Sequence, residues 1–226
     1  MDVGDVPTKT NKFTVNVIET SLTINKIDKD TIKKFKIGLS ISKTSLTDYL
    51  LNKQIPLKDL VSLGISNENG TDLFVNRIIF PLYDLQGNVV AFSGRIYNIK
   101  DPSKYINTKE TKIFKKGNLL YNYHQAKDIL KKSESIIVTE GFMDVIRAST
   151  IGINNCVATM GTAFTKQHAS LIKKLTDNVI LCYDGDAAGE KEFDFTFTNG
   201  KESVGEKVKI DVVNCDLPKA DFTCTH

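Results

Sequence analysis

Residues 136–148 read IIVTEGFMDVIRA, residues 156–165 read CVATMGTAFT, and residues 180–189 read ILCYDGDAAG. The first and third of these segments open with short apolar runs that lead directly into acidic residues and glycine. Short uninterrupted apolar runs bounded by turn residues are typical of strands buried on both faces of a parallel sheet. Helix-like segments separate the runs, and this alternation predicts a βαβ module of the α/β class with a mainly parallel sheet.

Acidic residues and glycines stand where the first and third of these strands end. Ligand sites of such sheets form at the carboxyl ends of the strands, and carboxylate oxygens are the donors that Mg²⁺ or Mn²⁺ takes. The spacing therefore predicts a divalent-metal site, in which a glycine after the first acid lets the backbone turn tightly into the next helix. The residues concerned are Glu140, Gly141, Asp144, Asp184, Gly185 and Asp186.

The composition of the 226-residue chain, 41% hydrophobic and 25% charged, is ordinary for a globular protein. No apolar run approaches the roughly 18 residues that span a membrane, and the N-terminus lacks the pattern of a signal peptide. We therefore expect a cytoplasmic protein without a membrane partner. The four cysteines include no CxxC pair, which argues against a zinc site in this chain.

Charge is divided unevenly along the chain. Residues 95–132 hold ten Lys or Arg against three Asp or Glu, whereas residues 181–226 hold five Lys against ten Asp or Glu. Basic side chains neutralise nucleic-acid phosphates, and carboxylates hold the cations that bridge to reacting phosphates. The two blocks together favour a metal site that handles a polyanion, and a solvated lysine-rich face is the simpler alternative.

The part of the chain before residue 133 predicts a basic α+β subdomain. Helical spacing marks residues 28–35, 45–51, 57–63 and 123–132. Two β-rich runs, 73–84 and 88–98, are separated by Leu85-Gln86-Gly87, a hairpin signal. We divide the chain into an uncertain leader at 1–25, the basic subdomain at 26–132 and the α/β module at 133–226, where residues 207–213 are a candidate edge strand.

An apolar strand ending in Glu-Gly, an Asp four residues on, and a strand ending in Asp-x-Asp resemble the TOPRIM domain, which primases, topoisomerases and several nucleases share. Upstream, RIIFPLYDLQGNVVAFSGRIY (77–97), KYINTKET (104–111) and IFKKGNLLYNYHQA (113–126) resemble the basic N-terminal half of the polymerase core of bacterial DnaG-type DNA primases. DTIKKFKIGLS (30–40) resembles the lead-in of that family. The resemblance covers residues 25–220 in collinear order.

This resemblance implies template-directed synthesis of RNA primers on single-stranded DNA from ribonucleoside triphosphates, a Mg²⁺-assisted nucleotidyl transfer. Glu140, Asp184 and Asp186 would be the catalytic metal-site carboxylates, with Glu140 either a ligand or a proton acceptor, and Asp144 would support them. The basic groove that handles template and nucleotide phosphates would contain Arg77, Arg95, Lys104, Tyr105, Asn107 and Lys116. A replicative helicase is the partner expected of full-length members.

The end of the chain departs from the family pattern. DVVNCDLPKADFTCTH (211–226) begins a further acidic motif, in which Asp221 matches the first acid and would be another metal ligand. Phe222-Thr223 replace the acids that should follow. Neither the family's zinc ribbon nor its helicase-binding region is recognisable, so we expect a truncated chain whose priming is impaired.

Other readings of these residues remain open. A TOPRIM nuclease or topoisomerase-like protein and a catalytically weak nucleic-acid-binding remnant are the alternative functions. A haloacid-dehalogenase-type phosphatase is disfavoured, because Ala187-Ala188 stand where that family has Thr or Val. Locally, Arg77 is a candidate for a plain ion pair, Lys115-Lys116 for an exposed lysine pair and Thr165 for a helix cap. We expect His124 and His168 to be surface helix residues.

Overall fold

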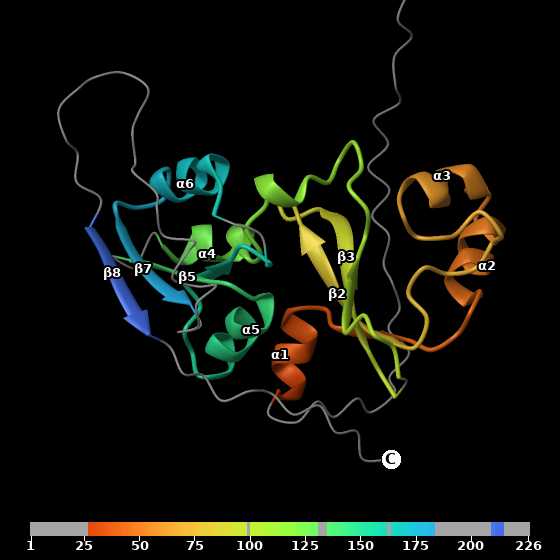
Figure 1. Ribbon diagram of the computed structural model, residues 1–226, viewed down its shortest axis with the longest axis horizontal. Helices are drawn as coiled ribbons and strands as arrows, with labels where there is room; N and C mark the ends of the chain where they lie inside the picture. Colours follow the sequence, from red (N-terminus) through yellow and green to blue (C-terminus); the bar gives the residue numbers. More distant parts are fainter. Residues whose placement is uncertain (1–26, 99, 131–134, 162–163, 184–208, 215–226) are drawn as a thin grey trace, which may run out of the picture.

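Two four-stranded sheets make up the framework of the molecule (Figure 1). The computed structural model describes residues 27–98, 100–130, 135–161, 164–183 and 209–214. Within these residues no helix is long and apolar enough to cross a membrane. One sheet is antiparallel and the other is parallel, which confirms the predicted fold class.

The antiparallel sheet has the order β1 (Gly38–Ser40), β2 (Arg77–Tyr83), β3 (Val89–Ile96) and β4 (Tyr105–Asn107). The predicted hairpin joins β2 to β3, and Gly87 in its turn has a φ of 88°, a conformation that favours glycine. Helix α1 (Lys29–Lys34) precedes β1 and begins at Asp28, whose carboxylate accepts the Thr31 backbone N–H at 2.7 Å. Asp is among the residues preferred at this capping position.

Two further helices, α2 (Ser45–Asn52) and α3 (Leu57–Ser62), lie beside the antiparallel sheet at the edge of the molecule (Figure 1). Both follow the predicted boundaries closely. The chain leaves α3 through Gly64, which has a φ of 66°. A Cβ at Gly64 would lie 2.9 Å from the Thr108 methyl group, so both backbone conformation and space call for glycine there.

The parallel sheet has the order β6 (Cys156–Ala158), β5 (Ile136–Thr139), β7 (Asn178–Tyr183) and β8 (Lys209–Asn214). Strand β8 is the predicted edge strand. Helices α4 (Tyr123–Ile129) and α6 (Lys166–Lys173) cover one face of the sheet, and α5 (Phe142–Thr150) covers the other (Figure 1). Burial on both faces explains why β5, β6 and β7 read as apolar runs.

Among the described residues, one of two apolar clusters joins the two sheets, and the other lies between the parallel sheet and helices α4 and α6. The joining cluster contains Ile78 and Phe80 of β2 together with Val145 and Ile146 of α5. Tyr121 connects the segment before α4 to the parallel sheet. Its backbone N–H donates to the carbonyl of Ala158 in the edge strand β6 at 2.9 Å. The acidic module and the basic subdomain are therefore packed against each other, and the ends of β5 and β4 are held near one another.

Candidate functional site

The carboxyl end of β5 is a short, well-fastened corner. Strand β5 ends at Thr139, whose buried hydroxyl lies 3.2 Å from the carbonyls of both Gly141 and Val157. Half-buried Glu140 follows, and its carbonyl accepts the Gly161 N–H at 3.2 Å. The corner therefore fixes the backbone from which the Glu140 carboxylate projects.

Asp144 lies in the first turn of α5 beside this corner. Its Oδ2 accepts the backbone N–H of Gly141 at 3.3 Å, which caps the helix. Gly141 has a φ of −109°, which any residue adopts, so the turn does not need glycine for its backbone conformation as the sequence suggested. A Cβ there would lie 3.0 Å from Asp144 Oδ2. Glycine instead leaves room for the carboxylate.

The register of the parallel sheet brings the end of β7 to the same edge. Thr139 of β5 is paired with Cys182 of β7. In sequence, Glu140 follows Thr139 directly, and Asp184 follows the last residue of β7. The predictions for Asp184, Gly185, Asp186 and Asp221 lie outside the described residues. Within the described residues no three His, Cys, Asp or Glu side chains gather as a metal cluster.

A cation–aromatic pair on the antiparallel sheet reaches the acidic corner. Arg95 of β3 donates from Nη1 to the Tyr105 hydroxyl at 2.6 Å, and its guanidinium carbon lies 5.3 Å from the Tyr105 ring centroid. The Tyr105 ring meets Phe142 edge to face, with centroids 5.7 Å apart. Because Phe142 is the first residue of α5 and lies two residues after Glu140, these contacts bring Arg95 and the acidic corner together.

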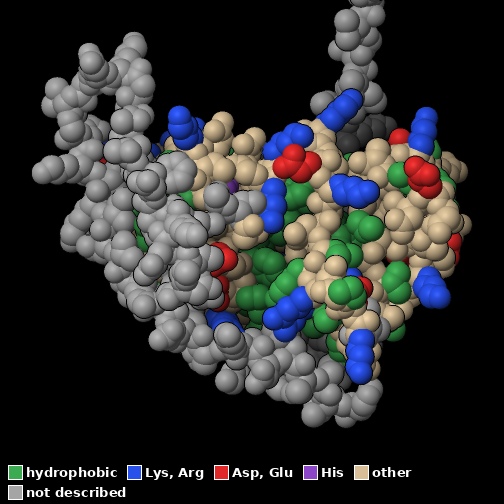
Figure 2. Space-filling view, viewed as in Figure 1, with side chains coloured by type: hydrophobic (Ala, Val, Ile, Leu, Met, Phe, Trp, Pro, Cys, Tyr) green, Lys and Arg blue, Asp and Glu red, His purple; other side chains and the backbone are tan. Residues whose placement is uncertain are grey.

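Side chains of both charges border a hollow on this side of the molecule. Figure 2 shows apolar side chains in a hollow near the middle of the view, with acidic side chains beside it toward the parallel sheet and Lys or Arg side chains above and below it. Lys104, directly before β4, and Asn107, the last residue of β4, are both exposed. The predicted basic-groove residues on β3 and β4 are thus presented at the surface or half-buried.

Lys116 is held in a different way. It begins the 3₁₀ turn η1 (Lys116–Asn118), and its backbone N–H donates to Glu110 Oε1 at 3.1 Å. Burial lowers the pKa of its half-buried ammonium group. Among the described residues its side chain has no ion-pair partner, whereas the exposed Lys115 pairs with Glu110 at 3.4 Å. The two lysines are therefore not an equivalent exposed pair.

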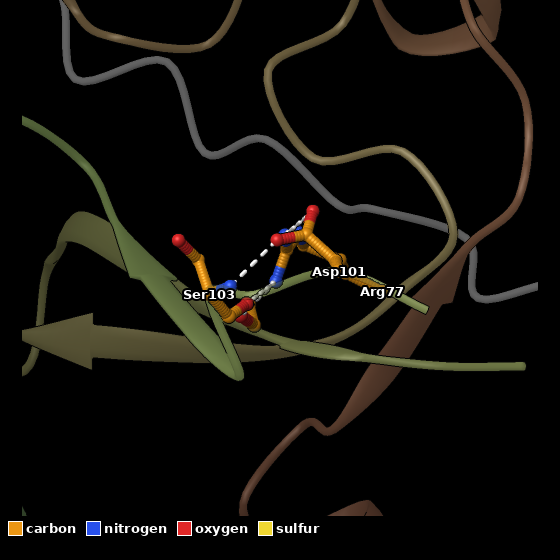
Figure 3. Close-up of polar contacts among 4 residues, drawn as sticks. Arg77, Asp101 and Ser103 are labelled. Carbon is orange, nitrogen blue, oxygen red and sulfur yellow. Dashed lines mark hydrogen bonds and ion pairs between the residues drawn. The ribbon is translucent and has the colours of Figure 1, made fainter. Parts of the chain in front are cut away.

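The guanidinium group of Arg77 is buried and is bonded to neighbouring residues of the protein (Figure 3). It forms an ion pair with Asp101 at 2.8 Å and donates to the carbonyls of Ser103 at 3.1 Å and Gly94 at 3.3 Å. The ion pair that the sequence left open is present. With the side chain only 4% exposed, Arg77 fastens the 101–103 loop to the sheet in this structure.

Two expectations about α6 have opposite outcomes. Thr165 caps the helix as predicted, since its hydroxyl accepts the His168 N–H at 3.1 Å. The prediction that His168 is a surface residue is wrong, because the side chain is fully buried. The error arose because His168 closes a Thr-x-x-His capping box, accepting the Thr165 N–H on Nδ1 at 3.2 Å, and so points inward. His124 is half-buried against Tyr83, so it is not fully at the surface either.

Sequence reasoning missed two residues that shape the site. Phe142 links the acidic corner to Tyr105, and the signal was an aromatic residue directly after Glu-Gly. His168 packs under the turn that carries Lys116, and the signal was the Thr-x-x-His spacing. The residues that they contact, Tyr105 and the Lys116 turn, lie far away in sequence, so the local motif does not reveal these contacts.

Comparison with known proteins gives a consistent result over most of the chain. The family model of the DNA primase catalytic core, N-terminal domain, matches residues 9–127, and a Toprim domain model matches residues 134–214. A DNA primase of Listeria monocytogenes is 43% identical over 143 residues, which are 63% of this chain and 22% of the relative. This chain spans about a fifth of the length of the curated relatives it matches.

Solved structures agree with this assignment. The zinc-binding and RNA polymerase domains of the Aquifex aeolicus primase match with a TM-score of 0.68 and 35% identity, over 74% of this chain and 42% of that one. A DnaG primase catalytic domain bound to single-stranded DNA matches with a TM-score of 0.67 and 34% identity, over 74% of this chain and 53% of that one. Since the first family model alone covers more than half of its residues, the chain belongs to the family of the DNA primase catalytic core.

Proposed function

We propose that this chain is the nucleotidyl-transfer core of a DNA primase, which joins ribonucleoside triphosphates into short RNA primers on a single-stranded DNA template. The observation that carries the proposal is the chain of contacts from Arg95 through Tyr105 to Phe142, which brings a basic sheet against the acidic end of β5. Primase relatives, one of them bound to single-stranded DNA, support the same reading.

The described donors fit a hard divalent cation. Glu140 and Asp144 offer carboxylate oxygens at a strand end and a helix start, which suits Mg²⁺ or Mn²⁺. We propose that Asp184, Asp186 and Asp221 hold the ion, and that Glu140 either joins them as a ligand or accepts a proton beside them. Asp144, Gly141 and Gly185 would shape the site. When bound, the ion would neutralise the triphosphate and lower the pKa of the attacking hydroxyl.

Different side chains of the protein would bind phosphates, accept a proton and hold other residues in place. The primer 3′-hydroxyl attacks the α-phosphate of the incoming nucleotide, its proton passes to a base, and pyrophosphate leaves. Glu140 is either a ligand or that base. Arg95, Lys104 and Lys116 would bind phosphates, Tyr105 would keep Arg95 oriented, and Asn107 would add a polar contact. Arg77 would contribute by holding the groove's loop in place.

Primer synthesis by the 226-residue chain tests the proposal. The assay uses single-stranded DNA, labelled ribonucleoside triphosphates and Mg²⁺. It is run at near-neutral pH, because we propose that the protein acts in the cytoplasm. Wild type should give short RNA products, and Asp184→Asn should lower their yield by at least about a hundredfold. Asp177→Asn is the matched control. Asp177 directly precedes β7, at the end opposite Asp184, and its side chain is 66% exposed. This substitution should leave the yield unchanged.

Two outcomes would contradict parts of the proposal. Wild type that binds the DNA without making product would favour the catalytically weak remnant. Product made equally well by Asp184→Asn would place the metal site elsewhere. A helicase that binds longer members of the family is a further partner to test, by asking whether it raises the yield of the same assay.

A further inference from the structure

The turn that carries Lys116 has little local support of its own. Its 3₁₀ hydrogen bonds are those from Asn118 N–H to the Lys115 carbonyl at 3.0 Å and from Leu119 N–H to the Lys116 carbonyl at 3.3 Å. A single 3₁₀ turn of three residues is too short to hold its shape alone. Buried Phe114 and Leu119 anchor the chain on either side of the turn, whereas Lys116, Gly117 and Asn118 are half-buried or exposed. Besides these anchors and the bond from the Lys116 N–H to Glu110, contacts from another element help to fix the turn.

Helix α6 contacts this turn at its N-terminal end. The Thr165 hydroxyl donates to the Gly117 carbonyl at 2.7 Å, across 48 positions of sequence. The same oxygen accepts the His168 N–H, so the cap of α6 is complete without the bond to Gly117. The bond to Gly117 therefore serves the turn and not the helix.

His168 supports the same turn from below. Its Nδ1 accepts the Thr165 N–H, which leaves the proton of the neutral ring on Nε2. Nε2 is buried and faces the carbonyls of Lys116 and Leu119, although it completes no hydrogen bond of standard geometry with a described residue. Burial lowers the pKa of His168, and these carbonyls offset part of that effect. A neutral ring lies under Lys116 without repelling its ammonium group.

We propose that Thr165 and His168 are positioning residues that hold the η1 turn, so that Lys116 points its ammonium group at a nucleic-acid phosphate. This inference rests on the proposed function, in which Lys116 belongs to the basic groove. A half-buried ammonium group has lost part of its hydration, and a phosphate restores the missing partner. Fixing the turn in advance removes the cost of ordering it on binding.

Matched substitutions separate this role from simple packing. Thr165→Val removes the hydroxyl and keeps the branched shape, and Thr165→Ser restores the hydroxyl. His168→Leu fills the ring's volume without polar atoms, and His168→Gln returns an N–H near the place of Nε2. Each variant is made in the full 226-residue chain, and its thermal midpoint is measured first, so that the Ser and Gln variants serve as folded references.

Two readouts are compared across the variants. Amide hydrogen exchange at Asn118 and Leu119 reports the order of the turn. Fluorescence anisotropy of a labelled single-stranded oligonucleotide, between about 50 and 200 mM salt, reports phosphate binding. Thr165→Val and His168→Leu should speed exchange at both amides and weaken binding by about tenfold, as Lys116→Ala does, with a salt slope smaller by about 0.7. The Ser and Gln variants should keep wild-type values.

The double variant decides between positioning and independent effects. Thr165→Val combined with Lys116→Ala should bind no more weakly than Lys116→Ala alone. Full additivity, or Thr165→Val with wild-type exchange and affinity, overturns the inference. Wild type that binds no oligonucleotide overturns the proposed function instead, and with it the binding role of Lys116.

Discussion

Asp72 holds a helix in place from a buried position. It is 3% exposed, and its carboxylate accepts the backbone N–H groups of Leu46 at 3.1 Å and Thr47 at 2.8 Å and the Thr47 hydroxyl at 2.6 Å. The first two donors belong to the first turn of α2, whose N-cap residue Thr44 makes no side-chain cap. Asp72 therefore caps α2 from 25 residues away.

Asp72→Ala should lower the free energy of unfolding by about 2–3 kcal/mol, because it leaves buried donors without acceptors. Asp48→Ala removes an exposed carboxylate from the same helix and should cost well under about 1 kcal/mol. Urea denaturation of both variants measures the difference. Equal losses for the two would contradict the capping role.

Single residues also mark where sequence reasoning stops. Glu140 was placed correctly at a strand end, because an apolar run followed by Glu-Gly signals such an end locally. The surroundings of Arg77 were left open, because its partner Asp101 lies 24 positions away. The inward direction of His168 depends on its packing beneath η1. Local patterns do not encode such distant partners.

At the scale of helices and strands, strong local residue patterns were enough to predict an element. The hairpin turn at Gly87 and the edge strand β8 were both predicted from local residue patterns. Strand β1 was missed. It has three half-buried residues, and only its antiparallel pairing with β2 makes it a strand.

Helix α6 makes stability depend on pH. Burial lowers the pKa of His168 below the value near 6.5 that the unfolded chain has. As pH falls through about 6.5, the unfolded chain takes up a proton that the folded chain resists, so folding is disfavoured on the acid side. Above about pH 7 both states are neutral at this residue, and its contribution is constant.

The denaturation midpoint of wild type should therefore fall between about pH 7 and pH 5. His168→Gln should fall less over the same range, and the remaining decrease includes His124, whose pKa burial also lowers. Urea titrations at fixed pH values measure both curves. Parallel curves for the two proteins would show that His168 is not the source.

At the scale of the whole molecule, the two sheets share one of the two apolar clusters of the described residues. Phe142 of α5 is 8% exposed, and its ring lies 4.8 Å from Phe80 and 5.4 Å from Tyr121, between centroids. The sequence indicated both halves and their order, but not that they pack through these rings. Contacts between segments that are distant in sequence leave no periodic pattern.

Phe142→Ala should cost about 3–4 kcal/mol and destabilise both sheets together. Ile151→Ala, at the exposed end of the same helix, should change stability by less than about 0.5 kcal/mol. The chain has no tryptophan, so tyrosine near-ultraviolet and far-ultraviolet circular dichroism are the two probes. Two separate transitions in wild type would contradict a shared core.

Iron-directed cleavage tests most directly whether a metal site lies where the acidic edge of the parallel sheet meets the basic sheet. Fe²⁺ in place of Mg²⁺ reduces added hydrogen peroxide to hydroxyl radicals, which cut the backbone nearest the ion, and ascorbate returns Fe³⁺ to Fe²⁺. Cuts are expected beside Glu140, in the segment after Tyr183 and near Tyr105, and excess Mg²⁺ should suppress them. Glu140→Gln and Asp184→Asn should abolish the cuts, and Asp177→Asn should keep them. Cuts elsewhere, or cuts unchanged in Glu140→Gln and Asp184→Asn, would contradict the site.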